Sequence, residues 1–167
     1  MRPETTTHQF HLIVFDLDGT LIKTAPEICD AVNDTLLQLK LAPASQSQVE
    51  LWIGHGTREL LIQAVAASTG KAESAVRSAN YFEQIASALP ATTTSHYNQR
   101  CGMRSIAYPG AVEALEKLSA TGVDLAIVTN KEAAYTRRIL DAHGLTVRFK
   151  KIGAATPCRP KNPVLRA

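Results

Sequence analysis

The chain has 167 residues, of which 45 % are hydrophobic and 20 % are charged. This length fits one domain with an insertion, and the apolar fraction is sufficient to build a hydrophobic core. The formal net charge is only +3, and the lysines and arginines are scattered apart from some gathering near the C-terminus, which argues against a nucleic-acid-binding protein.

The N-terminal segment and the cysteines indicate the cellular compartment in which the protein is expected. Residues 1–9 are polar and lack the apolar stretch of a secretion signal, and no apolar run is long enough to span a membrane. The cysteines, Cys29, Cys101 and Cys158, are odd in number and widely spaced. They form neither a disulfide framework nor a CxxC pair, which suits a reducing compartment. We therefore expect a cytoplasmic protein without a membrane partner.

The first expected element is a short apolar strand that ends in two carboxylates. Residues 12–15 are all apolar and include β-branched side chains, which predicts a strand buried on both faces. Asp16 and Asp18 follow directly, and an open α/β sheet binds its ligands beyond the carboxyl ends of the strands. Two acids this close repel each other, so a cation is the natural way to keep both charged.

The next two residues add groups that suit an anion. Gly19 allows backbone N–H groups to approach an anion, and the hydroxyl of Thr20 adds a donor. Two acids, a cation and a nest of amides together predict a phosphoryl-transfer site. The alternative is an ordinary turn that happens to carry the pattern Asp-x-Asp.

Residues 24–103 are predicted to be almost entirely helical. The first helix is expected to begin with Thr24 as its cap and Glu27 reaching back to it. Further helices are predicted over about residues 57–69 and 72–89 from the helical spacing of their apolar side chains.

After Tyr108-Pro-Gly110 the pattern changes to alternating helices and strands. A helix is predicted over about residues 112–121, and a buried strand over 123–128; a helix at 134–143 and a strand at 149–152 follow. Strands joined by helices with short loops are typical of a parallel sheet. The sequence thus predicts an α/β fold with a Rossmann-like core, residues 1–23 and 104–167, and an inserted helical cap, residues 24–103.

Motifs along the chain occur in the order of a known family. They are Asp16-Leu-Asp-Gly-Thr-Leu21 with Ala25-Pro26 after it, Trp52-Ile-Gly-His-Gly56, Tyr108-Pro-Gly110 and Val128-Thr-Asn-Lys131. With these motifs, the chain from about residue 11 to about residue 153 resembles the haloacid dehalogenase superfamily of phosphohydrolases. It is most similar to the branch with a helical cap after the first motif, and within that branch to bacterial phosphoglycolate phosphatases.

The resemblance implies Mg²⁺-dependent hydrolysis through an aspartyl-phosphate. Asp16 would be the nucleophile, and Asp18 would protonate the leaving oxygen and then activate water. The Asp16 carboxylate, the Asp18 backbone carbonyl and a later acidic motif would hold Mg²⁺. Lys161 lies where the family places a lysine that stabilises the transferring phosphate; a solvated tail lysine is the alternative.

Two further places are expected to contact the substrate. The hydroxyl of Thr129 and the amide of Asn130, after the second strand of the sheet, would hold the phosphoryl group. An ordinary helix cap at Thr129 is the alternative. The loop Gly54-His55-Gly56 would close on the substrate, although the family commonly has asparagine in place of His55; a plain turn between helices is equally compatible.

The end of the sequence departs from the family. Relatives continue for several tens of residues, with two more strands and the acidic motif of the metal site. After Gly153 the threonine and lysine spacing of the relatives persists, but their aspartate is lost. We expect a C-terminally truncated chain with an incomplete core, which a frameshift near Gly153 would explain. The apolar strand 12–15 would then lie at an exposed sheet edge and favour self-association.

The expected reaction is hydrolysis of 2-phosphoglycolate to glycolate and phosphate. The alternatives are another capped phosphatase, pyrophosphatase, nucleotidase or sugar-phosphate mutase, and a truncated, catalytically inactive remnant. The expected partner is a small phosphate ester, with no nucleic acid.

Overall fold

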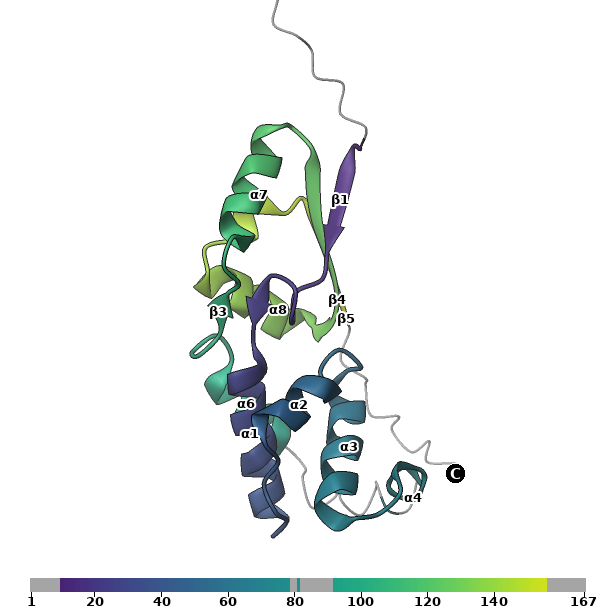
Figure 1. Ribbon diagram of the computed structural model, residues 1–167. Helices are drawn as coiled ribbons and strands as arrows, with labels where there is room; N and C mark the ends of the chain where they lie inside the picture. Colours follow the sequence, from purple (N-terminus) through teal and green to yellow (C-terminus); the bar gives the residue numbers. More distant parts are fainter. Residues whose placement is uncertain (1–9, 79–80, 82–91, 156–167) are drawn as a thin grey trace, which may run out of the picture.

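The computed structural model describes residues 10–78, 81 and 92–155, which form an α/β region and a helical region (Figure 1). The α/β region contains β1 (Leu12–Phe15), α7 (Ala111–Ala120), β4 (Asp124–Glu132), α8 (Ala133–Ala142), the 3₁₀ turn η1 (Thr146–Arg148) and β5 (Lys151–Ala155). The helical region contains α1 (Ala25–Gln38), α2 (Gln46–Trp52), α3 (Thr57–Thr69), α4 (Glu73–Arg77) and α6 (Thr92–Arg100). The chain passes between the two regions through β2 (Ile22–Lys23) and β3 (Ile106–Ala107), which pair with each other.

The sheet of the α/β region has three parallel strands in the order β1-β4-β5, which confirms the predicted fold class. Phe15 of β1 is in register with Ile127 of β4, and Val128 is in register with Gly153 of β5. Because the two strands are parallel, the residues that follow Phe15 and the residues that follow Ile127 lie next to each other. They form the carboxyl-terminal end of the sheet.

A single hydrophobic cluster joins this sheet to α7 and α8. Leu115, Leu125, Ile127, Ile139 and Leu140 are among its almost fully buried members. Burying each such side chain contributes about 1.5–3 kcal/mol. Both helices lie on the same side of the strands (Figure 1), so they cover one face of the sheet and hold the strand ends in place.

On the opposite face of the sheet, the larger apolar side chains are exposed among the described residues. Leu12, Val14 and Val128 are 50 %, 52 % and 59 % exposed, whereas Ile13 and Phe15 pack against the helices. The prediction that β1 is buried on both faces is therefore wrong for this part of the chain. Side chains alternate between the faces of a strand, and α7 and α8 both pack on the same one.

This apolar face and the outer edge of β1, which pairs with no other described strand, should make the 167-residue polypeptide self-associate. Exposed apolar patches and open strand edges are templates for association with another chain. Val14→Lys places a charge on the patch and should shift the polypeptide towards monomer in light scattering coupled to size exclusion. Val147→Lys makes the same change at an exposed position in η1 and should leave the association unchanged. A wild-type polypeptide that stays monomeric at every concentration would contradict this expectation.

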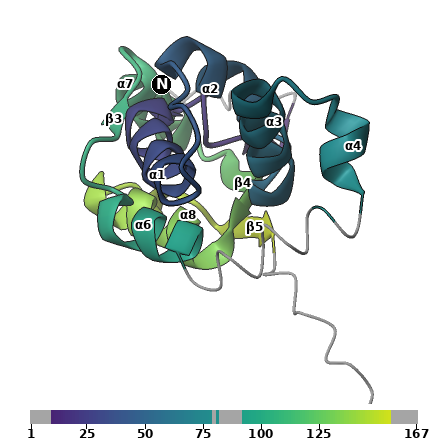
Figure 2. The ribbon, with the colours of Figure 1, turned by 90° about the horizontal axis from the view of Figure 1, so that it is seen from below.

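The helical region has a hydrophobic cluster of its own. Its buried members include Val32 and Leu36 of α1, Val49 of α2, and Ile62 and Val65 of α3. Helix α1 packs against α2, α3 and α6, and Figure 2 shows α6 along one side of α1, with α3 and α4 on the other. The predicted helix over residues 57–69 is confirmed. The predicted third helix is present as α4, which ends at Arg77; most of its remainder lies outside the described residues.

The start of α1 differs from the prediction of a capping box. Thr24 makes no side-chain cap, and Glu27, although fully buried, does not reach back to it. The carboxylate of Glu27 instead accepts hydrogen bonds from the backbone N–H groups of Gly102, Arg104 and Ser105 at 3.0–3.3 Å. Glu27 therefore binds backbone N–H groups that are distant in the sequence instead of the N–H of its own helix cap. The local spacing of residues does not reveal this difference.

Glu27→Ala should lower the free energy of unfolding by about 3 kcal/mol, because it leaves several buried donors without an acceptor. Glu113→Ala is the matched control, since Glu113 is also in the first turn of its helix but is exposed; its effect should stay within about 0.5 kcal/mol. Chemical denaturation measures both changes. Equal changes for the two variants would show that the Glu27 interactions contribute little.

Cys29 and Cys101 are buried free thiols whose pKa is raised, chiefly by burial; Cys158 lies outside the described residues. None of the described helices is long and apolar enough to cross a membrane.

Candidate active site

Asp16 and Asp18 lie on a tight turn directly after β1. The carbonyl of Leu17 accepts hydrogen bonds from the N–H groups of Leu21 and Ile22, both at 3.1 Å. The turn requires φ of +76° at Gly19, which favours glycine because the residue has no side chain. Asp16 is exposed at the end of the strand, while the side chain of Asp18 is only 11 % exposed. The turn thus gives two neighbouring carboxylates different environments.

Both carboxylate oxygens of Asp18 are held by other side chains. The hydroxyl of Thr24 donates to Oδ1 at 2.7 Å. The ammonium of Lys131, on β4, lies 3.2 Å from Oδ2, and its side chain is 6 % exposed. Because both oxygens have a partner, the orientation of this carboxylate is fixed, which suits a group that transfers a proton at a defined place.

The end of β4 lies beside these carboxylates, as the parallel register requires. Thr129 is buried, and its hydroxyl accepts from the N–H of Lys131 at 3.3 Å. The strand continues to Glu132, and α8 begins at Ala133. The alternative interpretation of Thr129 as a helix cap is therefore wrong, because the helix begins too late.

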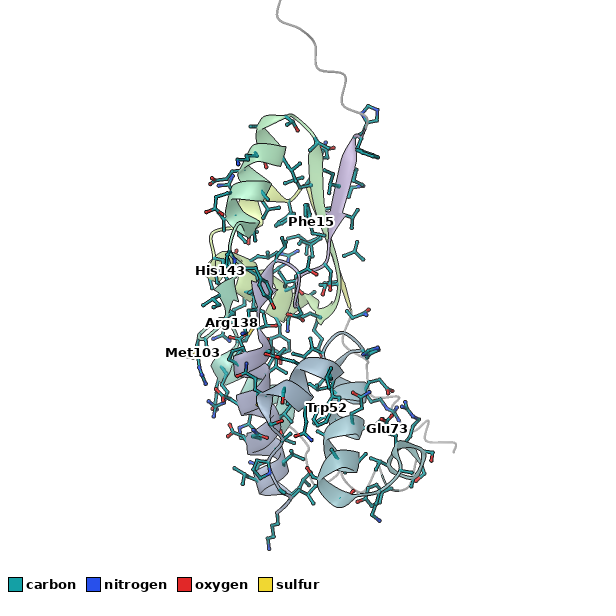
Figure 3. The ribbon with its side chains drawn as sticks, viewed as in Figure 1. Phe15, Trp52, Glu73, Met103, Arg138 and His143 are labelled. Carbon is teal, nitrogen blue, oxygen red and sulfur yellow. The ribbon has the colours of Figure 1, made fainter. Side chains whose placement is uncertain are left out.

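A cavity of about 240 Å³ lies between the end of the sheet and the helical region. Polar side chains from the α/β region line one side, namely Asp16, Asp18, Thr129, Asn130, Lys131 and Glu132. The helical region contributes an apolar wall that includes Ile28, Val32, Trp52, Ile53 and Leu60. Figure 3 shows Phe15, in the strand that leads to Asp16, and Trp52 on opposite sides of this junction. The arrangement places carboxylates at one end of an otherwise largely apolar chamber.

The loop of Gly54, His55 and Gly56 touches the α/β region directly. The side-chain amide of Asn130 donates to the carbonyl oxygen of Gly54 at 2.8 Å. Gly54 and Gly56 line the cavity, whereas His55 is exposed and does not. The structure thus brings the two glycines of the loop to the cavity, but not the side chain of His55.

Gly19 and Thr20, predicted to bind phosphate, are also absent from the cavity lining. Their N–H groups donate within the turn, to Ile22 at 3.0 Å and to Leu17 at 3.3 Å respectively. Lys161 lies outside the described residues. The structure therefore brings Asp16, Asp18, Thr129 and Asn130 together and leaves Gly19 and Thr20 in the turn beside them.

Three residues near Asp18 were missed by sequence reasoning. The local pattern places Thr24 at a helix cap and Lys131 at the end of a motif, and it carries no signal that Tyr97 contacts either of them. The hydroxyl of Tyr97 accepts from Lys131 at 2.9 Å. A lysine directly after Thr-Asn at a strand end was a signal for Lys131, but pairing it with Asp18 required the register of β1 and β4.

Comparisons with known proteins identify the family of this chain. Residues 13–166 match the family described as haloacid dehalogenase-like hydrolases. The phosphoglycolate phosphatase of Psychrobacter arcticus is 32 % identical over 156 residues, which cover 91 % of this chain and 65 % of that protein. The phosphoglycolate phosphatase of Cereibacter sphaeroides is 37 % identical over 158 residues, which cover 93 % of this chain and 68 % of that protein.

A solved structure shows the same similarity. The crystal structure of a predicted phosphoglycolate phosphatase from Haemophilus somnus 129PT superposes with a TM-score of 0.75 at 32 % identity, covering 89 % of this chain and 64 % of that one. The chain thus spans about two thirds of the length of these relatives. The match over residues 13–166 shows that the chain belongs to the haloacid dehalogenase-like hydrolases, and the superposition with the Haemophilus somnus structure shows the same fold.

Proposed function

We propose that this chain carries the nucleophile of a phosphatase that hydrolyses a small phosphate monoester through an aspartyl-phosphate intermediate. The observation that carries the proposal is the position of Asp16 and Asp18 at the end of β1, beside Thr129, facing a cavity walled by the helical region. In this proposal residues 24–103 form a cap, and residues 1–23 and 104–167 form the core.

The two carboxylates have separate roles in this reaction. An oxygen of Asp16 attacks phosphorus while the bond between phosphorus and the leaving oxygen breaks, and Asp18 gives that oxygen a proton. Water then attacks the aspartyl-phosphate, Asp18 takes a proton from the water, and inorganic phosphate leaves. The different surroundings of the two residues support this division, since Asp16 is exposed while Asp18 is held by Thr24 and Lys131.

The oxygen atoms at the carboxyl end of β1 also suit a weakly bound Mg²⁺. The carboxylate of Asp16 and the backbone carbonyl of Asp18 are the oxygen donors that Mg²⁺ prefers. No third acidic, histidine or cysteine side chain joins them in the described part of the chain. When bound, Mg²⁺ would neutralise the charge that develops on the phosphoryl group.

The first candidate substrate is 2-phosphoglycolate, because the relatives that are 32 % and 37 % identical are phosphoglycolate phosphatases. A second candidate class is supported by the wall of the cavity. Ile28, Trp52 and Leu60 present apolar surface, which suits an ester whose leaving group is larger and more apolar than glycolate.

One experiment tests the proposal and ranks the substrates. The purified chain is incubated with Mg²⁺ and p-nitrophenyl phosphate, and then with a panel that contains 2-phosphoglycolate, pyrophosphate, nucleotides, sugar phosphates and longer alkyl phosphates. Release of phosphate that requires Mg²⁺ is the expected result. Absence of release from every ester would instead support an inactive remnant that only binds phosphate or a partner.

A further inference from the structure

Lys131 is a buried cation that joins the core to the cap. It belongs to β4 of the core, and its ammonium lies 3.2 Å from Oδ2 of Asp18. On its other side the ammonium is 2.9 Å from the hydroxyl oxygen of Tyr97, which belongs to α6 in the cap. The side chain that holds the proposed acid–base group is thus itself held by the cap.

The donor and acceptor roles along this contact are determined by the chemistry of the groups. Burial, with nearby negative charges as a smaller cause, raises the pKa of Tyr97 far above its usual value, so the phenol keeps its proton. Lys131 can only donate, so the oxygen of Tyr97 accepts from it. The phenol proton is then directed to Oε1 of Glu27, 3.1 Å away.

Glu27 connects these residues to the segment that leads from the cap back to the core. Its carboxylate accepts from the backbone N–H groups of Gly102, Arg104 and Ser105, between α6 and β3. Asp18, Lys131, Tyr97 and Glu27 therefore form one continuous, largely buried chain, which runs from the proposed acid–base carboxylate to the segment between α6 and β3.

We propose that Lys131 is a positioning residue: it fixes the orientation of Asp18, and it does so only while Tyr97 and Glu27 hold the cap against the core. Thr24 fixes one oxygen of Asp18 and Lys131 fixes the other. If the cap moves away, Lys131 loses its contact with Tyr97, and Asp18 loses the second of its two constraints. This inference rests on the proposed function only in giving Asp18 an acid–base role.

The first test compares esters with poor and good leaving groups. An alkyl phosphate needs a proton on its leaving oxygen, whereas p-nitrophenolate leaves with little assistance. Lys131→Met and Tyr97→Phe should therefore lower kcat for the alkyl ester about tenfold or more beyond any loss for p-nitrophenyl phosphate, with KM nearly unchanged. Equal losses for both esters would overturn the positioning role. A rise in KM alone would assign Lys131 to phosphate binding and overturn it as well.

Matched controls remove the same chemical groups elsewhere. Lys150→Met deletes a lysine that makes an exposed ion pair with Asp124, and Tyr108→Phe deletes the hydroxyl of a tyrosine outside the cavity lining. Both variants should retain the kinetics of the wild type on both esters. If they show the same leaving-group dependence as Lys131→Met, that dependence does not come from the buried chain, and the proposal fails.

The second test does not need activity, so it separates failure of this inference from failure of the proposed function. Asp18→Asn should speed hydrogen exchange at the amide of Ser105 by about threefold or more, because the buried chain transmits the loss to Glu27. In the Lys131→Met background the same substitution should have no further effect. An equal effect in both backgrounds, or none in either, would overturn the inference even if the chain hydrolyses phosphate esters.

Discussion

Asp16→Asn should lower phosphate release by about a thousandfold or more, because the amide keeps the shape of the side chain but cannot attack phosphorus as an anion. Substrate binding should survive or become tighter, since the repulsion between the Asp16 carboxylate and the phosphate disappears. Steady-state phosphate release measures the first effect, and titration with substrate at equilibrium measures the second.

The control for this result is Asp124→Asn. Asp124 is a partly exposed carboxylate at the opposite end of the sheet, where it pairs with Lys150, and its loss should leave turnover near that of the wild type. Turnover by Asp16→Asn at a comparable level would exclude an aspartyl-phosphate on Asp16. It would direct attention to Glu132, which also lines the cavity.

The 167-residue polypeptide should bind Mg²⁺ weakly and turn over slowly. Only Asp16 and the carbonyl of Asp18 are expected to contact the ion, so it would keep most of its waters. No Asp or Glu follows Asp141 in the sequence, so the tail has no carboxylate to add. Joining the corresponding C-terminal part of the Psychrobacter arcticus relative after Gly153 should raise Mg²⁺ affinity and turnover together, the latter by roughly a hundredfold or more.

Calorimetric titration with Mg²⁺ and phosphate release are compared for the polypeptide with and without the added segment. A segment in which every acidic residue is replaced by its amide is the control, and it should restore neither property. Strong Mg²⁺-dependent turnover by a monomer of the unextended polypeptide would show that the ligands come from another part of the chain.

The sequence predicted those features that depend on local pattern. The strand before Asp16, the strand predicted over residues 123–128 and the parallel sheet are confirmed, because apolar runs joined by amphipathic helices allow few other arrangements; the second of these strands continues to Glu132. The exposure of Val14 was not predictable in this way, since a run of apolar residues does not reveal how many helices cover each face.

Features that depend on contacts distant in sequence were missed or assigned wrongly. Glu27 reads as part of a capping box, but its carboxylate binds amides more than seventy positions further along the chain. Lys131 reads as part of a motif, but its meeting with Asp18 requires the register of two strands and its meeting with Tyr97 requires the packing of α6. Only the three-dimensional arrangement joins these residues.

The pairing of β2 with β3 has a consequence for how this protein can be modified. Ile22 lies opposite Ala107, and Lys23 lies opposite Ile106, so the two chain crossings between the regions run side by side. The helices between them have their own hydrophobic cluster, separate in composition from the cluster of the sheet except for Tyr97. A segment that begins and ends at adjacent positions and has a hydrophobic core of its own can be exchanged between proteins without rearranging the rest of the fold. We therefore expect the helices between β2 and β3 to be exchangeable with the corresponding helices of other haloacid dehalogenase-like hydrolases, provided that Thr24 and Tyr97, which contact Asp18 and Lys131, are kept.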